Sequence, residues 1–441
     1  MIFDVPFLRR GWVRKVVPTV IVLLMGYGSF LCYYSIGYSE IWRFHSHGVA
    51  IEFWCLIAIC QCCIAWYWVF MFVIGPGRAP KFNLFDLYQT NIDRSNRQKI
   101  INRIQNHTNE SRSGELTNSD QLDFTTGGDL ETVSSNSSRL ITVPDIFVCD
   151  QYGFPYYDSH TQSMTLSRSF YLKQLGYLVL KYDHYCVWVG TVIGQSNYLF
   201  FLKFMIWFWF FFVVAFVHLI RYTPSNVRRG EINHNFILGY ILCVFWLLML
   251  SGLLFVHLRY VVKNMTTLDE MTENQAKRYA KWMKKKNKDE NRSPRKENGI
   301  RFVNVAHDNI RLVVPYDIKQ GVFNMGFKKN WINLIFNGNR NHGYRGGYGS
   351  GQLVLAFLVF LCPFIDTYFA FKYNQVHLDD AESAPDLHLA KYMAYSSQFN
   401  EKFMDYVKTQ IENKQCHLPL YIKIETEKAT SDETRNVDPV S

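Results

Sequence analysis

Four long apolar runs constrain this chain more than any other feature of its sequence. A helix needs roughly 20 consecutive, mostly apolar residues to cross the hydrocarbon core of a bilayer. The first run is too long for the apolar part of a signal peptide and lacks a small-residue cleavage site, so we interpret it as an anchor. The sequence therefore predicts an all-α polytopic membrane protein with four transmembrane helices. These runs occupy residues 16–38, 53–75, 198–220 and 236–258.

The distribution of Lys and Arg predicts how the helices are oriented, because these residues are enriched in cytoplasmic loops near the span ends. They are dense before the first run, between the second and third, and after the fourth. The two short loops carry fewer, although Arg228 and Arg229 weaken the contrast. We expect a multi-pass protein of an endomembrane or the plasma membrane, with both termini cytosolic. The expected cytosolic segments are residues 1–15, 76–197 and 259–441.

The composition of the aqueous parts divides them further. Residues 105–140 hold few large apolar side chains, so we expect a disordered insert there. Aromatic and β-branched residues return at 141–197, which should be the folded catalytic loop domain. The net charge of +10 fits contact with an anionic lipid leaflet better than contact with nucleic acid.

The tail carries three distinct stretches. Residues 277–296 are strongly basic, which is typical of a solvated charged helix or of a segment attracted to anionic lipid or to acyl-CoA phosphates. Residues 320–335 form an aromatic and Asn-containing motif. The apolar run at 353–364 favours a short interfacial or buried helix, with a fifth span as the alternative.

The stretch "YDHYCVWVG", residues 182–190, contains the candidate catalytic residues. Side chains two positions apart share one face of an extended backbone, so His184 and Cys186 can meet there. His184 would accept the thiol proton and stabilise the reactive thiolate, while Asp183 would orient the imidazole. A structural cysteine beside a surface histidine is the plain alternative.

The position of Cys186 favours the reactive interpretation. It lies about a dozen residues before the third apolar run, on the expected cytosolic side. A thiolate there faces the plane where acyl-CoA chains insert while their headgroups stay in water. Attack of a thiolate on a thioester exchanges two similar leaving groups. This location therefore indicates acyl transfer through an S-acyl-cysteine.

The stretch around Cys186 resembles the core of the DHHC protein S-acyltransferases, in the fungal variant with Tyr185 at the second His. Three further motifs match that family in order along a four-span chain. "GPG" stands where the family has Asp-Pro-Gly, and "TTLDE" where it has Thr-Thr-x-Glu. "FNMGFKKNW" resembles its C-terminal aromatic and Asn motif. The matching segments are residues 178–201, 75–77, 266–270 and 323–331.

The resemblance implies a fold and an activity. Spans two and three would flank the catalytic loop, and Cys186 would be acylated from a fatty acyl-CoA, usually palmitoyl-CoA. The acyl group would then pass to a membrane-proximal cytosolic cysteine of a client protein. Its chain would occupy a cavity among the four spans. The partners implied are client proteins, acyl-CoA and the bilayer, without nucleic acid.

The chain departs from the family at its zinc sites, each of which uses three Cys and one His. Leu178 and Val192 stand where zinc cysteines are expected, and Tyr185 where a ligand His would be. Cys149 and His160 supply two ligands, which do not close a tetrahedral site. We therefore expect no zinc, and an apolar core from residues 170–180 with Phe154, Tyr156 and Tyr157 in its place.

Two other function classes stay open. A catalytically silent membrane adaptor would explain the missing zinc ligands, although it leaves the retained Asp183, His184 and Cys186 without a role. A transporter or channel predicts ionisable residues deep in several spans. Lys203 lies near the start of the third run, where snorkelling to the interface explains it, and His218 lies near its end.

Overall fold

The computed structural model describes most of the chain outside one long internal stretch. The predicted insert at 105–140 lies outside the described residues. The described ranges are 13–79, 82–83, 141–142, 144–161, 163–230, 233–290, 299–307, 310–336, 349–367 and 399–419.

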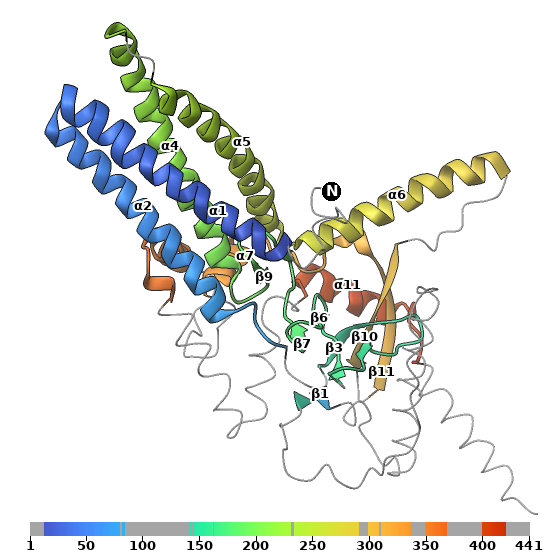
Figure 1. Ribbon diagram of the computed structural model, residues 1–441. Helices are drawn as coiled ribbons and strands as arrows, with labels where there is room; N and C mark the ends of the chain where they lie inside the picture. Colours follow the sequence, from blue (N-terminus) through green and yellow to red (C-terminus); the bar gives the residue numbers. More distant parts are fainter. Residues whose placement is uncertain are drawn as a thin grey trace, which may run out of the picture.

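Four long apolar helices form an elongated bundle (Figure 1). The first is α1 continued by the π-helical segment η2. Each predicted run coincides with one of these helices, which confirms the prediction of four apolar helices long enough to cross a bilayer. The elements are α1 (Val13–Phe30), η2 (Leu31–Trp42), α2 (His47–Ile74), α4 (Tyr198–Arg228) and α5 (His234–Lys263).

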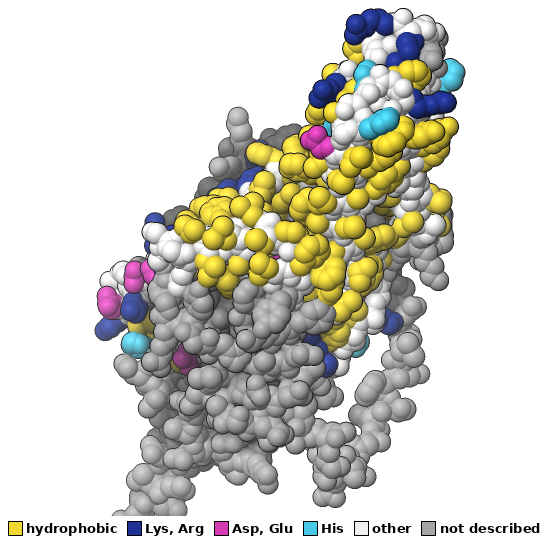
Figure 2. Space-filling model, turned by 90° about the vertical axis from the view of Figure 1, so that its left-hand side faces the viewer, with side chains coloured by type: hydrophobic (Ala, Val, Ile, Leu, Met, Phe, Trp, Pro, Cys, Tyr) yellow, Lys and Arg dark blue, Asp and Glu magenta, His cyan; other side chains and the backbone are white. Residues whose placement is uncertain are grey.

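Helix α4 is the centre of the bundle. Of its most apolar stretch 56% is buried, against 22–33% for the other three, and it packs against α2, α5 and η2. Outward-facing apolar side chains such as Leu23, Leu248 and Phe255 are about 70% exposed. Figure 2 shows a broad hydrophobic surface on one face of the bundle. Such a continuous apolar belt is what a lipid-facing surface requires.

In its described residues, the segment between α2 and α4 is built from short strand pairs rather than helices. Strand β1 pairs in parallel with β2, and three antiparallel hairpins follow. Apart from the extended backbone considered for His184 and Cys186, none of these strands was predicted from the sequence. The pairs are β1 (Phe82–Asn83) with β2 (Ile141–Thr142), β4 (Tyr157–Asp158) with β5 (Ser163–Met164), β6 (Phe170–Leu172) with β7 (Tyr177–Val179), and β8 (His184–Cys186) with β9 (Thr191–Ile193).

The tail shares a sheet with this segment. Strands β10 (Ile300–His307) and β11 (Ile310–Asp317) form an antiparallel pair, and β10 also pairs with β3 (Ile146–Cys149). Alternate valines of these strands face α11 (Glu401–Glu412), where Phe403 and Val407 complete a small core. The loop and tail therefore fold as one body beneath the bundle (Figure 1).

The remaining helices surround the lower end of the bundle. Helix α6 projects away from it (Figure 1). Helix α8 is apolar but has 12 residues, fewer than a span needs, and it packs on α7 with Ala356 and Val359 buried. The bounds are α6 (Thr267–Glu290), η4 (Ile318–Gln320), α7 (Phe327–Ile335) and α8 (Ser350–Leu361).

The snorkelling interpretation of Lys203 was wrong. Lys203 is 2% exposed, and its ammonium group pairs with the carboxylate of Asp366 at 3.1 Å. The same Nζ atom donates to the carbonyl oxygens of Val359 (3.3 Å) and Cys362 (3.4 Å) at the end of α8. Because Asp366 is itself 2% exposed, this is a buried ion pair that fastens the tail to α4.

Candidate active site

The hairpin of β8 and β9 carries Cys186 to the lower end of the bundle. Gly190 closes its turn by donating to the Cys186 carbonyl oxygen (2.8 Å) at φ +87°. The Trp68 indole of α2 donates to the Val189 carbonyl (3.1 Å) and holds the turn in place. A Cβ at position 190 would approach Pro18 of α1 to 3.1 Å. The turn is thus wedged between two membrane helices.

Asp183, His184 and Cys186 come together in this hairpin. Strand β8 is extended from His184 to Cys186, so these two side chains share one face of it. The Asp183 carboxylate accepts from His184 Nδ1 at 2.6 Å. With Nδ1 engaged, the other ring nitrogen remains for the Cys186 thiol, with which His184 also forms a hydrogen bond. The order Asp183–His184–Cys186 is the geometry of an oriented base and its nucleophile.

Thr267 of α6 completes the environment of Asp183. Its backbone N donates to Oδ1 at 2.7 Å, and its hydroxyl donates to Oδ2 at 2.8 Å. Asp183 is 1% exposed, and a buried carboxylate without such donors would be costly. Three hydrogen bonds therefore fix this carboxylate and, through it, the ring of His184.

The two ionisable partners shift in opposite directions. Burial disfavours the imidazolium, yet the hydrogen bonds to Asp183 and Cys186 outweigh it and raise the pKa of His184 to about 10. Burial also disfavours the carboxylate, but His184 and the Thr267 N–H lower the pKa of Asp183 to about 2. His184 is thus protonated at neutral pH, beside the sulfur.

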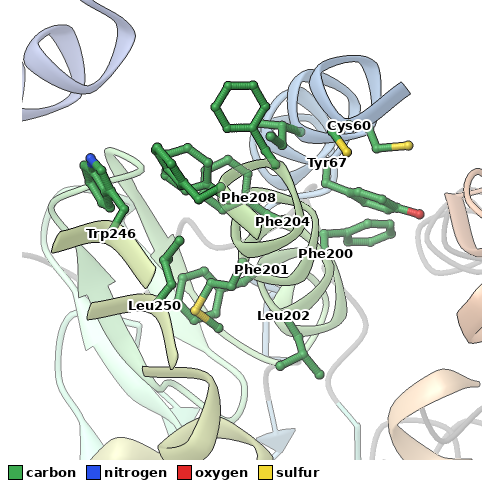
Figure 3. Packing of buried hydrophobic residues seen from close by; sticks show 14 of the residues in the cluster. Cys60, Tyr67, Phe200, Phe201, Leu202, Phe204, Phe208, Trp246 and Leu250 are labelled. Carbon is green, nitrogen blue, oxygen red and sulfur yellow. The ribbon is translucent and has the colours of Figure 1, made fainter. Parts of the chain in front are cut away.

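An apolar cavity opens directly from Cys186 into the bundle. The space in it, including the part that is open to solvent, is about 610 Å³. From the level of Phe201 to that of Phe208 it follows α4 for two turns, about 10 Å at 1.5 Å per residue. Figure 3 shows Phe204 and Phe208 of α4 with Trp246 and Leu250 of α5 across from them. The lining residues are Ile21, His184, Cys186, Trp188, Val189, Phe201, Phe204, Met205, Phe208, Trp246, Met249, Leu250, Leu253, His257 and Thr267.

Aromatic rings surround the inner part of this cavity. Trp246 stacks on Phe212 at 5.9 Å between centroids and contacts Phe208 at 5.2 Å. Trp188 of the hairpin turn meets Trp246 edge-on at 6.2 Å. Polar groups are confined to the mouth, at His184, Cys186, His257 and Thr267. The cavity suits a hydrocarbon chain whose reactive end lies at the sulfur.

The Gly-Pro-Gly turn after α2 supports the hairpin from behind. The Pro76 carbonyl accepts from Ser196 N, and the Gly77 carbonyl accepts from Leu180 N, both at 3.2 Å. Gly77 has φ +92°, and a Cβ there would lie 2.5 Å from Ser196 Oγ. Only glycine fits this close approach.

The end of α5 is tied to the loop by a polar cluster. Asn264 ends α5 in the left-handed conformation (φ 49°) and accepts from the Lys181 ammonium at 2.8 Å. Arg168 donates to the Asn264 carbonyl and pairs with Asp269 at 2.9 Å. Burial, followed by the nearby Arg168, lowers the pKa of Lys181 to about 7. The Asn330 amide of α7 donates to the Val262 carbonyl at 2.7 Å, which joins the tail motif to the same helix end.

Two residues at the site were not singled out from the sequence as site residues. Thr267 belongs to the recognised "TTLDE" segment, but its bonds to Asp183 depend on the folded arrangement. His257 of α5 lines the cavity mouth, and its Nδ1 lies 2.9 Å from the hydroxyl of Tyr198. An ionisable residue inside an apolar run is a default functional candidate, so His257 carried a signal that the sequence analysis overlooked.

The residues at the expected zinc positions do not fit a metal. Leu178 and Val192 are buried apolar residues, at 3% and 5% exposure. Tyr185 pairs with Val192 across the hairpin, and its hydroxyl donates to the Gly190 carbonyl at 3.4 Å. Within the described ranges no group of three or more His, Cys, Asp or Glu side chains could hold a metal ion. The absence of zinc stays a prediction.

The expected apolar substitute for zinc is present in part. Phe154, Tyr157 and residues 178–180 are buried. Tyr156 and Phe170 are about half exposed, so they lie outside that core. The ring of His160 stacks on Tyr171 at 4.7 Å.

Comparison with known proteins identifies the family of the chain. The DHHC palmitoyltransferase family matches residues 152–274. The chain is 39% identical to Palmitoyltransferase PFA5 of Candida albicans over 458 aligned positions, which cover all of both proteins. It is 29% identical to Palmitoyltransferase PFA5 of Kluyveromyces lactis, over 59% of this chain and 65% of that protein. For Palmitoyltransferase PFA5 of Saccharomyces cerevisiae the identity is 22%, over 62% and 66%. The chain belongs to the DHHC palmitoyltransferase family.

Proposed function

We propose that this protein transfers a palmitoyl group from palmitoyl-CoA to Cys186 and then to a cysteine of a client protein. Its family gives the enzyme class, a protein S-acyltransferase with acyl-CoA as donor. The observation that carries the assignment of Cys186 is its position at the mouth of an apolar cavity, beside the His184–Asp183 pair.

In the first step the Cys186 thiolate attacks the thioester carbonyl carbon of palmitoyl-CoA. The new carbon–sulfur bond forms to Cys186 as the bond to the CoA sulfur breaks. The leaving CoA thiolate takes a proton from the His184 imidazolium, which leaves His184 neutral. Asp183 keeps the ring oriented throughout and stabilises its charged form.

In the second step a client cysteine displaces Cys186. Neutral His184 accepts the client thiol proton, and the client sulfur attacks the acyl carbon. The bond to Cys186 breaks, which restores its thiolate beside the imidazolium. Both steps exchange one thioester for another, so the site needs orientation and charge stabilisation rather than a strong driving force.

The apolar cavity supports the choice of a long acyl chain. A chain that enters from Cys186 meets only apolar side chains beyond the mouth, and their burial favours binding at about 25 cal/mol for each Å² removed from water. We propose that the hairpin lies at the cytosolic face, because the loop and tail carry the excess of basic residues. Client cysteines would then be cytosolic and close to the membrane.

The test uses purified protein in lipid vesicles with labelled palmitoyl-CoA. Wild type is expected to acquire a hydroxylamine-sensitive label, and Cys186→Ala to acquire none. Cys416→Ala is the matched control, because it removes a thiol from the same aqueous body at a site remote in the fold, and it should label like wild type. Absence of label on wild type would refute the proposal. It would favour the catalytically silent adaptor, which would also explain the missing zinc ligands.

A further inference from the structure

A second cavity lies at the end of the bundle remote from Cys186. Helix α4 runs from Tyr198 beside the hairpin to Arg221, and at 1.5 Å per residue these positions are about 35 Å apart along it. The cavity holds about 1320 Å³ of space open to solvent. It is formed by the connection from η2 to α2 and by the last turns of α4. Its lining residues are Phe44, His45, Ser46, Val49, Arg221, Tyr222, Ser225, Arg228 and Arg229.

Basic side chains dominate the polar lining. Figure 2 shows Lys and Arg side chains gathered at this tip of the molecule, beyond the apolar belt. One carboxylate, Glu40 of η2, lies behind the cavity and is 1% exposed. It pairs with Arg229 and accepts from His45 at 3.2 Å. Within the described residues no carboxylate pairs with Arg221 or Arg228, so the cavity keeps two positive charges.

The start of α2 adds a second preference for an anion. Ser46 is its N-cap residue, and the Ser46 side chain makes no capping hydrogen bond. The first N–H groups of a helix lack internal partners and carry the positive end of its dipole. Gly48 leaves the approach to them open, since an added Cβ would meet only Ser46 Oγ within 4 Å. Guanidinium groups and a helix N-terminus together favour a phosphate.

The surroundings of the cavity indicate that the phosphate belongs to a lipid. Phe44, Ile220 and Val227, at or beside the cavity rim, are 47–66% exposed, and they offer an apolar surface to acyl chains. The cavity also lies where the apolar belt ends (Figure 2), which is the level of lipid headgroups. Arg228 and Arg229 stand at the end of α4, beside a short loop where the rule of basic cytoplasmic loops does not call for them. A ligand explains their presence there.

We propose that this cavity binds the phosphate of an anionic phospholipid headgroup. Arg221 and Arg228 would contact the phosphate oxygens, and the N–H groups at the start of α2 would complete the contact. Glu40 orients Arg229 without neutralising the other two arginines. The bound headgroup would join the start of α2 to the last turns of α4. The inference does not depend on the proposed function of Cys186.

The test measures lipid retention by native mass spectrometry of the full-length protein in detergent with phosphatidic acid or phosphatidylcholine. Wild type is expected to retain phosphatidic acid selectively. The double variant Arg221→Gln/Arg228→Gln should bind it at least tenfold more weakly, because charge-assisted hydrogen bonds are lost. Both arginines are exposed, and Arg229 is left in place so that Glu40 keeps its partner.

Arg43→Gln is the matched control. Arg43 is exposed at the same end of the bundle but lies over the Tyr38 ring, outside the cavity. This variant should bind phosphatidic acid like wild type, and labelling of Cys186 should persist in all three proteins. Equal retention of both lipids, or equal loss in the control and the double variant, would overturn the proposal. A further measurement uses inorganic phosphate alone and compares how far it and phosphatidic acid raise the unfolding temperature of wild type. If phosphate raises it as much as phosphatidic acid does, the cavity binds a free anion and the lipid assignment is overturned.

Discussion

Replacing Asp183 by Asn tests how the thiol of Cys186 is activated. The two carboxylate oxygens accept three hydrogen bonds, from the Thr267 N–H, the Thr267 hydroxyl and His184 Nδ1. An asparagine of nearly the same size offers one oxygen and one NH₂ group. The NH₂ group must face at least one of these donors, and a buried donor without a partner costs about 1–3 kcal/mol.

The effect on His184 is larger. Its pKa is about 10 instead of 6.5, a difference of about 3.5, and at about 1.4 kcal/mol per unit the folded site stabilises the imidazolium by about 5 kcal/mol. If Asp183 supplies half of this, its loss weakens the stabilisation of the imidazolium about fiftyfold, so His184 loses its proton at a distinctly lower pH than in wild type, although it stays mostly protonated at neutral pH. Thioester formation in Asp183→Asn should slow about tenfold or more at neutral pH, because the His184 ring loses the carboxylate that orients it, and the pH profile of the rate should shift to lower pH.

The pH dependence has a definite sign. A raised histidine pKa contributes fully to the stability of the folded protein below pH 6.5, and this contribution is lost as the pH rises through about 10. The lowered pKa of Asp183 contributes above pH 3.8 and is lost as the pH falls through about 2. Wild type should therefore exceed Asp183→Asn in unfolding free energy most clearly between pH 4 and 6.5.

The assay is a single turnover with saturating palmitoyl-CoA from pH 6 to 10. The rate of thioester formation is followed in wild type, Asp183→Asn and the control Asp145→Asn, which removes an exposed carboxylate of the same loop. The control should behave like wild type. A rate for Asp183→Asn within threefold of wild type, with an unchanged pH profile, would refute the role of Asp183.

Three further predictions concern the ion pair, the cavity and the metal. Asp366→Asn leaves the Lys203 ammonium buried without its counter-ion, so the protein should lose about 3–5 kcal/mol of stability, measured by thermal unfolding; an unchanged unfolding temperature would contradict the buried pair. Leu250→Trp fills the cavity roughly 10 Å from the His257 level, so the rate ratio of palmitoyl-CoA to a shorter acyl-CoA should fall about tenfold; an unchanged ratio would mean that the chain binds elsewhere. Metal analysis of purified protein should find less than one zinc per chain, and two equivalents would show that the loop binds zinc after all.

The membrane helices were predictable because their cause is local. A helix that crosses a bilayer needs a continuous apolar run, and each of the four runs meets that need within its own sequence. The shared face of His184 and Cys186 was predictable for the same reason, because it follows from a spacing of two in an extended strand. Such features need no knowledge of distant parts of the chain.

The contacts that complete the structure depend on partners far away in the sequence. Strand β10 pairs with β3, about 150 residues earlier. The local sequence of such short strands of mixed composition does not identify the strand with which each one pairs. Lys203 looked like an interfacial lysine because Asp366 lies outside every predicted span. Thr267 was part of a recognised motif, but its bond to Asp183 is a tertiary contact that no local pattern contains.

Mapping the acyl group after brief incubation with palmitoyl-CoA tests the role of Cys186 most directly. Trypsin cleaves after Lys181 and Lys203, and the peptide between them contains a single cysteine, Cys186. Mass spectrometry of wild type is expected to find a palmitoyl thioester on this peptide that hydroxylamine removes and that disappears when a client protein is added. A thioester confined to other cysteines, such as Cys149 or Cys416, would contradict the assignment of Cys186 as the nucleophile.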